Sequence, residues 1–212
     1  LTEIGASLGS NLTSIRALAV FFVVIGFAFK ISAVPFHTWA PDTYQGAPTP
    51  VTAFLSVASK AAGFVALVTV VYVGFPGSHA VWQPVFWILS AATMTLGNVM
   101  ALKQTNIVRM LAYSSIAHAG FLLSGVIALN KAGLDATIFY LFAYGVATVG
   151  AFAVVTLVRD SSGEVTDLNR WKGLGKRSPF AASAFALFLL AFAGIPLTSG
   201  FIGKFSIFSA AY

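Results

Sequence analysis

The sequence contains no cysteine and very few charged residues. Of its 212 residues, 8% are charged and 58% are hydrophobic. About a quarter of the residues of an ordinary soluble domain are charged, so that class is excluded. Without cysteine, disulfides and thiol-ligated iron–sulfur clusters are excluded within this chain. Lys and Arg outnumber Asp and Glu by 12 to 6. Because the basic residues are scattered among apolar runs, we expect a lipid bilayer and no nucleic acid as partner.

The apolar runs predict a membrane protein, because a spanning helix needs about 20 apolar residues. No initiator methionine opens the chain, and it ends at Tyr212 inside an apolar segment. We therefore expect residues 1–212 to be a single transmembrane domain and an internal piece of a longer protein. The expected fold is all-α, a polytopic transmembrane helix bundle with discontinuous helices. Its six or so spans cover about residues 11–30, with Asn11 or Thr13 as cap, then 51–73, 81–102, 107–129, 136–158 and 179–212.

The polar links between these spans predict their orientation. The polar segment 159–178 could carry a short surface helix. If the spans alternate, the opposite links, 74–80 and 130–135, carry only Lys131. The positive-inside rule then places the basic links in the cytoplasm. The residues on that side are Lys103, Arg109, Arg159, Arg170, Lys172, Lys176 and Arg177.

Two spans carry a break next to a lysine. Pro35 follows Lys30 by five residues and should end its helix, because proline lacks an N–H and clashes with the preceding turn. The last span would be about 51 Å long as a straight helix, too long for the bilayer. Pro196 should interrupt it and free the carbonyl of Phe192. Lys204 then belongs to the second half-helix, whose dipole should favour release of its proton. Interrupted helices of this kind form ion sites in transporters.

Lys60 lies in the middle of the second span. Ten residues separate it from Pro50, or about 15 Å of helix, half the thickness of the hydrocarbon layer. An ammonium group at that depth costs roughly 3 kcal/mol on insertion scales. Desolvation favours the neutral amine, which predicts a titrating group. The alternative is a lysine that fixes helix packing by pairing with a carboxylate, but no acidic residue occurs in the middle of a span.

The histidines are weaker candidates. His37 follows the first break and could relay protons between Lys30 and the cytoplasmic side. His118 shares a helix face with Ser114 and Ser115 and could belong to a polar file, although a core histidine bonded to a neighbour is an equal interpretation. Tyr140, Tyr144 and Thr148 recur every four residues in the fifth span, which packing explains as well as a water path does.

Four motifs together resemble the antiporter-like membrane subunits of respiratory complex I, the proton-pumping NADH:quinone oxidoreductase. These motifs cover most of the chain. They are Phe29-Lys30-Ile-Ser-Ala-Val-Pro35-Phe-His37-x-Trp39-x-Pro41-Asp42, Gly46-Ala-Pro-Thr-Pro50 through Ser59-Lys60, Lys103-Gln-Thr-Asn106-x-x-Arg109-Met-Leu-Ala-Tyr113-Ser114-Ser115, and Gly194-Ile-Pro196-Leu-Thr-Ser-Gly200-Phe-Ile-Gly-Lys204-Phe. Within the family, the lysine at the last break is typical of the N-type (subunit 2) branch, since the M-type pattern has glutamate there.

The resemblance implies a function and partners. Lys30, Lys60 and Lys204 match the family's proton-channel lysines. The glutamate that pairs with the first of them in the family has no counterpart in this chain. The implied function is proton translocation by a non-redox subunit of the oxidoreductase, a translocase of the bacterial plasma membrane that crosses it several times. No cofactor is expected on this chain, and flavin, iron–sulfur clusters and quinone are expected in partner subunits. The implied partners are the other membrane-arm subunits, including an M-type neighbour and small membrane subunits.

Two other classes of protein compete with this interpretation. A subunit of a multisubunit cation/proton antiporter shares the helix pattern and needs the same buried titratable groups. A structural membrane module would use its lysines only for packing. Normal activity in variants without the buried lysines would favour the structural module.

Overall fold

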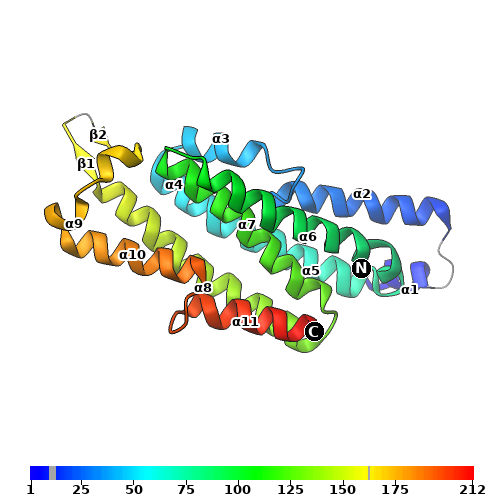
Figure 1. Ribbon diagram of the computed structural model, residues 1–212. Helices are drawn as coiled ribbons and strands as arrows, with labels where there is room; N and C mark the ends of the chain where they lie inside the picture. The colour runs from blue at the N-terminus through cyan, green and yellow to red at the C-terminus, as the bar shows by residue number, and fades with distance from the viewer. Residues whose placement is uncertain (10–12, 162) are drawn as a thin grey trace.

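Helices that run roughly side by side form an elongated bundle in the computed structural model (Figure 1). The structure describes residues 1–9, 13–161 and 163–212. In chain order, with π- and 3₁₀-helical segments labelled η, the elements are α1 (Thr2–Gly9), α2 (Ser14–Lys30), α3 (Trp39–Gly46), α4 (Thr49–Phe54), η1 (Leu55–Ser59), α5 (Lys60–Thr69), η2 (Val70–Gly74), η3 (Pro76–Ser78), α6 (His79–Leu102), α7 (Ile107–Ile127), α8 (Lys131–Leu157), β1 (Arg159–Asp160), β2 (Gly163–Glu164), η4 (Leu168–Trp171), α9 (Leu174–Arg177), α10 (Pro179–Ala193) and α11 (Ser199–Ala211). The predicted helical membrane bundle is confirmed.

Four of the six expected spans are helices long and apolar enough to cross a membrane. They cover Thr49–Gly74, Pro76–Leu102, Ile107–Ile127 and Lys131–Leu157. The fourth begins before the predicted position 136 because the Asn130 side chain caps it, accepting a 2.7 Å hydrogen bond from the backbone N–H of Gly133.

The two remaining spans are shorter. α2 has 17 residues, and the last span is divided between α10 and α11. Of the two residues proposed to cap α2, Asn11 lies outside the described residues. Thr13 occupies the N-cap position but makes no hydrogen bond there with its side chain.

Helix α7 lies at the centre of the bundle. Nearly all of its residues are buried, and it packs against α3, α6, α8 and α11. Two glycines allow α6 and α7 to approach closely. A Cβ atom on Gly97 would lie 2.7 Å from the backbone nitrogen of Ala117, and one on Gly120 would lie 2.8 Å from the carbonyl oxygen of Ser90. The side chains of α7 therefore face helices on several sides, and they form the centre of the site described below.

The polar residues 159–178 form one end of the bundle. This segment contains the expected short helix, α9, and also an antiparallel hairpin formed by the two-residue strands β1 and β2. Gly163 permits the turn with a φ of +114°, which favours glycine. The polar segment is joined to two spans. The Thr49 hydroxyl donates a 2.5 Å hydrogen bond to Glu164, and Asn106 forms a β-bridge with Asp167.

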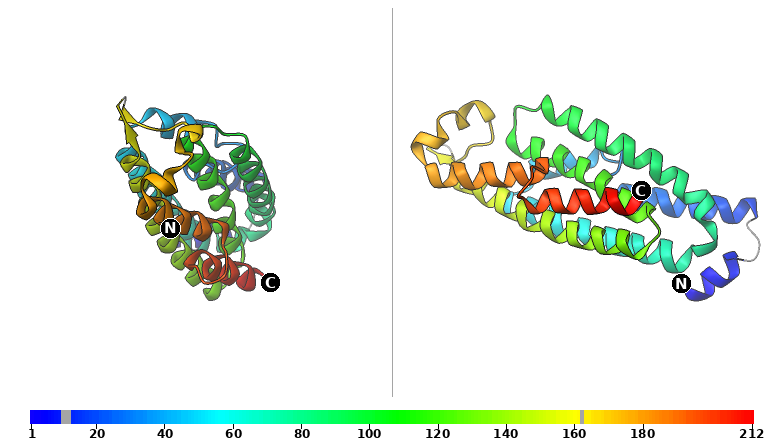
Figure 2. Two further views of the ribbon diagram at one scale, coloured as in Figure 1. Left: turned by 60° about the vertical axis from the view of Figure 1, so that its left-hand side comes forward. Right: turned by 60° about the horizontal axis from the view of Figure 1, so that its bottom comes forward.

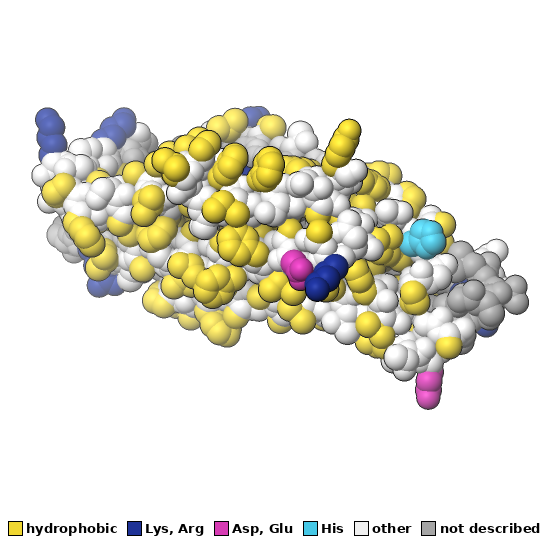
Figure 3. All heavy atoms as spheres, turned by 90° about the horizontal axis from the view of Figure 1, so that it is seen from below, with side chains coloured by type: hydrophobic (Ala, Val, Ile, Leu, Met, Phe, Trp, Pro, Cys, Tyr) yellow, Lys and Arg dark blue, Asp and Glu magenta, His cyan; other side chains and the backbone are white. Residues whose placement is uncertain are grey.

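The charged residues follow this arrangement. Lys and Arg side chains gather at the end that carries β1, β2 and α9, which we call the basic end (Figure 3). Apolar side chains cover most of the middle of the same view. The links 74–80 and 130–135 lie at the opposite end (Figure 1). The predicted separation of basic and neutral links is therefore present in the fold.

Both predicted helix breaks are present, and the helices before them, α2 and α10, end in the same way. α2 ends at Lys30, and the Ala33 N–H donates to the carbonyl of Ala28 across a left-handed residue, Ser32, whose φ is 61°. α10 ends likewise, with the Ile195 N–H donating to the carbonyl of Leu190 across a left-handed glycine. This is the hydrogen-bond pattern of a Schellman motif. Figure 2 shows α10 and α11 following one another along the bundle on either side of their break.

Candidate functional site

Lys60 is buried in the middle of its span, with a side chain that is 3% exposed. Its ammonium group donates hydrogen bonds to the backbone carbonyl and, at 2.6 Å, to the hydroxyl of Ser115 on α7. None of the described residues gives it a carboxylate partner. The alternative interpretation, a lysine paired with a carboxylate, is therefore not supported within the described residues. The π-helical segment η1 ends immediately before Lys60. Such segments are frequent at functional sites.

His118 lies one turn beyond Ser115 on the same face of α7 and is also 3% exposed. Its Nδ1 atom is 2.6 Å from the hydroxyl of Tyr140 on α8. Which of the two atoms donates depends on the tautomer, but the contact fixes the orientation of the ring. The imidazole ring also contacts the rings of Phe121, Tyr144 and Phe192. His118 is therefore both a core histidine bonded to a neighbour and a member of a polar file.

Lys204 reaches back across the second break. Its ammonium group donates hydrogen bonds to the carbonyls of Phe192 at 2.6 Å and Ala193 at 3.3 Å, at the end of α10. The predicted free carbonyl of Phe192 is thus confirmed as a binding partner. The dipole of the second half-helix is not the nearest one to this ammonium group, because the side chain carries the charge to the C-terminus of α10; proton release by Lys204 stays a prediction. That terminus is the negative end of the helix dipole and interacts favourably with a cation.

The three groups form one line along α7. Lys60 binds Ser115, His118 follows three residues later, and Lys204 lies 4.4 Å from the centre of the Phe121 ring, three residues further on. From Ser115 to Phe121, α7 rises about 9 Å. We call Lys60, His118 and Lys204 the lysine–histidine row.

Two aromatic side chains close the gaps within this row. The Tyr144 ring is 5.6 Å from the Lys60 nitrogen and 4.9 Å from the His118 ring. The Phe192 ring is 5.4 Å from the His118 ring, and Phe192 also supplies the carbonyl that binds Lys204. A cavity of about 10 Å³ beside His118 is lined by both rings. This volume is near the lower limit for one water molecule. The row therefore brings proton donors and acceptors close together inside the bundle.

Lys30 lies beside the lysine–histidine row but outside the core. It is the last residue of α2, as predicted, and its side chain is exposed in this chain. A Cβ atom on Gly63 would lie 3.3 Å from its Cγ atom, so the stem of Lys30 passes α5 one turn after Lys60. The indole of Trp39 donates a 3.1 Å hydrogen bond to the carbonyl of Phe29, next to Lys30. The break thus places Lys30 near Lys60 without a direct contact.

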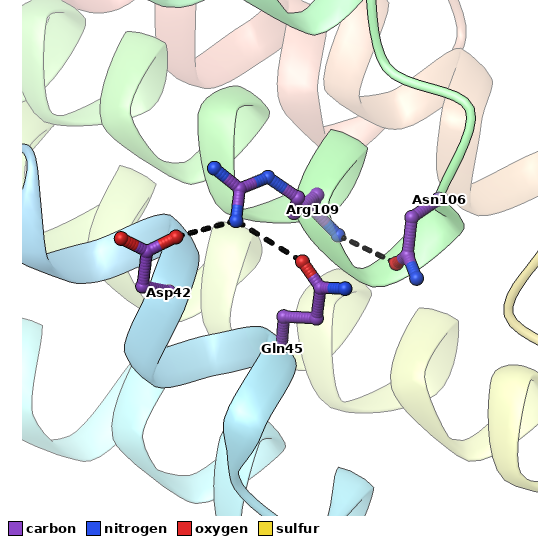
Figure 4. A network of polar contacts seen from close by, with 4 residues as sticks. All are labelled: Asp42, Gln45, Asn106 and Arg109. Atoms are coloured by element: carbon purple, nitrogen blue, oxygen red, sulfur yellow. Dashed lines mark hydrogen bonds and ion pairs between the residues drawn. The ribbon is translucent and has the colours of Figure 1, made fainter.

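His37 lies apart from the row, in the connection between α2 and α3. It is partly buried, its Nδ1 atom has no hydrogen-bond partner among the described residues, and its ring is 6.5 Å from that of Tyr113. Nearby, Arg109 donates hydrogen bonds to Asp42 at 2.5 Å and to Gln45 at 3.0 Å. Figure 4 shows these contacts between α3 and the first turn of α7, which Asn106 caps. The position of His37 leaves its predicted relay role a prediction.

Sequence reasoning did not identify Ser115, Tyr140 and Tyr144 as site residues. The two tyrosines belong to the four-residue stripe with Thr148, and Ser115, Tyr140 and Tyr144 are buried and contact Lys60 or His118. The Tyr144 side chain lies near the hydroxyls of Ser115 and Thr148. The four-residue spacing of the tyrosines is the only sequence signal for their role. It does not reveal their partners, because the contacts of Ser115 and Tyr140 join residues far apart in the chain. Among the described residues, no three His, Asp or Glu side chains gather as a metal site would require.

The comparisons with known proteins agree with this geometry. Residues 2–212 match the family model described as NADH:quinone oxidoreductase/Mrp antiporter, TM. The chain belongs to this family. NADH-quinone oxidoreductase subunit N of Rhodococcus opacus is 57% identical over 203 residues, which are 96% of this chain and 38% of that protein. The protein of the same name from Mycobacterium tuberculosis is 56% identical over 202 residues, 93% of this chain and 38% of that protein.

Solved structures of the family share the fold. A chain of respiratory complex I from Thermus thermophilus superposes with a TM-score of 0.78 at 37% identity, over 95% of this chain and 44% of that one. A chain of the Mrp complex from Dietzia superposes with a TM-score of 0.87 at 28% identity, over 96% of this chain and 38% of that one. The chain thus spans less than half of the length of these relatives. It is a multi-pass membrane protein with the antiporter-like fold of the family.

Proposed function

We propose that this chain is the proton-conducting part of a membrane-arm subunit of a bacterial NADH:quinone oxidoreductase. The observation that carries the proposal is the lysine–histidine row. Lys60 contacts Ser115 of α7, His118 lies one turn later on that helix, and Lys204 contacts Phe121 in the turn after that, in a fold whose curated relatives are named NADH-quinone oxidoreductase subunit N. Titratable groups inside a membrane are costly and are typical of proton relays.

In this function each residue has its own role in proton transfer. Lys60 gains or loses a proton while its hydrogen bonds to Ser115 hold the nitrogen in place. His118 exchanges a proton through the ring nitrogen that does not face Tyr140. Lys204 holds or releases a proton at the carbonyls of the broken helix. Lys30, beside Gly63, exchanges protons with Lys60, and His37 serves as a relay near the first break.

The chain itself takes no part in redox chemistry under this proposal. Flavin, iron–sulfur clusters and quinone belong to partner subunits, and the energy of quinone reduction reaches the row through them. The partners are the other membrane-arm subunits, among them an M-type neighbour and small membrane subunits, in the bacterial plasma membrane. The names of the relatives at 53–57% identity support this assignment.

The second candidate is a subunit of a multisubunit cation/proton antiporter. It is favoured by the superposition on the Dietzia Mrp complex. Purification of the full-length protein from its own membranes through an affinity tag tests the choice. The oxidoreductase predicts flavin and iron–sulfur clusters in the purified complex, together with NADH-driven quinone reduction. A complex of membrane subunits alone, which exchanges cations for protons, would contradict it.

A further inference from the structure

Tyr44 carries a buried hydroxyl group close to the hydrogen-bond partner of Lys60. It lies in α3, the half-helix that follows the first break, and it is 3% exposed. Its ring packs in a hydrophobic cluster together with residues of α7 and α8. The Tyr44 side chain lies within hydrogen-bonding reach of the Ser115 side chain and near Tyr144. The first broken helix therefore reaches the serine that binds Lys60.

The position of Tyr44 is fixed from two sides. The Thr52 hydroxyl, on a residue that is 0% exposed, donates a 2.8 Å hydrogen bond to the carbonyl of Tyr44. Arg109 of α7 binds Asp42 and Gln45, which lie two residues before and one residue after Tyr44 (Figure 4). These contacts hold α3 against α7, so the fold rather than chance places the Tyr44 ring beside Ser115.

The Ser115 hydroxyl has to change its hydrogen bonding when Lys60 changes its charge. An ammonium group only donates, whereas a serine hydroxyl has one hydrogen to donate and two lone pairs. While Lys60 is charged, the Ser115 oxygen accepts its hydrogen at 2.6 Å, and the hydrogen of Ser115 itself needs another acceptor. The phenolic oxygens of Tyr44 and Tyr144 lie beside it. Once Lys60 is neutral, its nitrogen has a lone pair that accepts this hydrogen instead.

We propose that Tyr44 is a positioning residue for proton transfer at Lys60, because together with Tyr144 it accepts the hydrogen of Ser115 while Lys60 is charged. The proposal rests on the proposed function and deepens it by adding a residue of α3 that affects how firmly Lys60 holds its proton. When Lys60 releases the proton, the Ser115 hydroxyl turns from the tyrosines to the amine nitrogen. Only hydrogen bonds are exchanged in this step, and no covalent bond is formed at Tyr44.

Removing the phenolic oxygen of Tyr44 from the complete complex tests the proposal. Tyr44→Phe keeps the ring and deprives Ser115 of one acceptor, and a buried donor without an acceptor is costly. We expect a severalfold lower rate of NADH-driven pumping in inside-out vesicles and a shifted pH profile of pumping. Tyr72→Phe is the matched control, since the Tyr72 hydroxyl donates to the carbonyl of Val126, about 16 Å along α7 from Ser115. Its pH profile should equal that of the parent complex.

A double-mutant cycle separates this role from packing. Ser115→Ala removes the hydrogen that Tyr44 accepts, so adding Tyr44→Phe to it should shift the pH profile no further. Ser115→Thr keeps a hydroxyl, so the shift caused by Tyr44→Phe should persist in that background, which also serves if the alanine variant does not assemble.

Two results would overturn the role of Tyr44. One is an assembled Tyr44→Phe complex with the pH profile of the parent, and the other is the same shift with and without the Ser115 hydroxyl. If Lys60→Ala abolishes pumping in that case, the proposed function stands and the Tyr44 ring serves packing alone. Normal pumping by Lys60→Ala would instead contradict the proposed function itself.

Discussion

The ammonium group of Lys204 donates a 2.6 Å hydrogen bond to the carbonyl of Phe192, twelve residues earlier and across a break in the helix. The carbonyl is one that the end of α10 leaves without an intrahelical partner. In a membrane such a group must be satisfied by protein or water. Lys204 therefore supplies the hydrogen bond that the broken helix leaves unmade at Phe192. The break also places the charge of Lys204 next to His118 and Phe121.

The second break should depend on Gly194 more than on Pro196. Gly194 has a φ of +78°, and a Cβ atom there would lie 2.9 Å from the Lys204 side chain. Gly194→Ala should therefore strain the backbone, displace Lys204 and lower proton pumping severalfold. Pro196→Ala should have a smaller effect, because the left-handed glycine and the Thr198 cap of α11 remain. NADH-driven pumping in inside-out vesicles measures both. Gly26→Ala is the control, since no atom lies within 4 Å of its Cβ position.

Tyr140 should position His118. Tyr140→Phe removes the hydroxyl that contacts Nδ1 and leaves a buried nitrogen unsatisfied, which costs about 1–3 kcal/mol. We expect reduced pumping and a shifted pH profile of pumping. Gly203→Ala should act similarly although it removes no polar group, because its Cβ atom would overlap the Tyr140 ring. A pH profile identical to that of the parent complex in both variants would show that the contact serves packing alone.

The topology prediction needs accessible positions at the two ends. Ser161 is exposed in the hairpin at the basic end, and Ala80 is exposed at the opposite end. Cysteines at these positions should react with an impermeant thiol reagent from opposite sides of the membrane, with Ser161→Cys reacting from the cytoplasm. Reaction of both from one side would contradict the arrangement of the spans.

The sequence allows the helices and their breaks to be predicted because the signals for them are local. Long apolar runs define the spans, and proline and glycine end two of them beside Lys30 and Lys204. The hairpin of β1 and β2 was missed because two-residue strands leave no periodic pattern. The π-helical segment before Lys60 was missed for a related reason, since its side chains show the same composition as an α-helix.

The pairing within the site is a different kind of information. Lys60 meets Ser115 at a separation of 55 residues, and His118 meets Tyr140 at 22. These contacts depend on how α5, α7 and α8 are rotated against one another, which no local pattern encodes. The reach of Lys204 to the end of α10 also depends on side-chain direction across the break. Chain position alone assigns Lys204 to the dipole of α11, whereas its ammonium group lies at the C-terminus of α10.

Proton pumping by Lys60 variants of the complete complex tests the central claim most directly. NADH-driven acidification of inside-out vesicles is measured beside NADH:quinone reduction and the assembly of the complex. Lys60→Ala should assemble and lose most pumping. Lys60→Arg should also pump poorly, because a guanidinium group does not release its proton. An assembled Lys60→Ala complex that pumps at the rate of the parent would contradict the role of the lysine–histidine row.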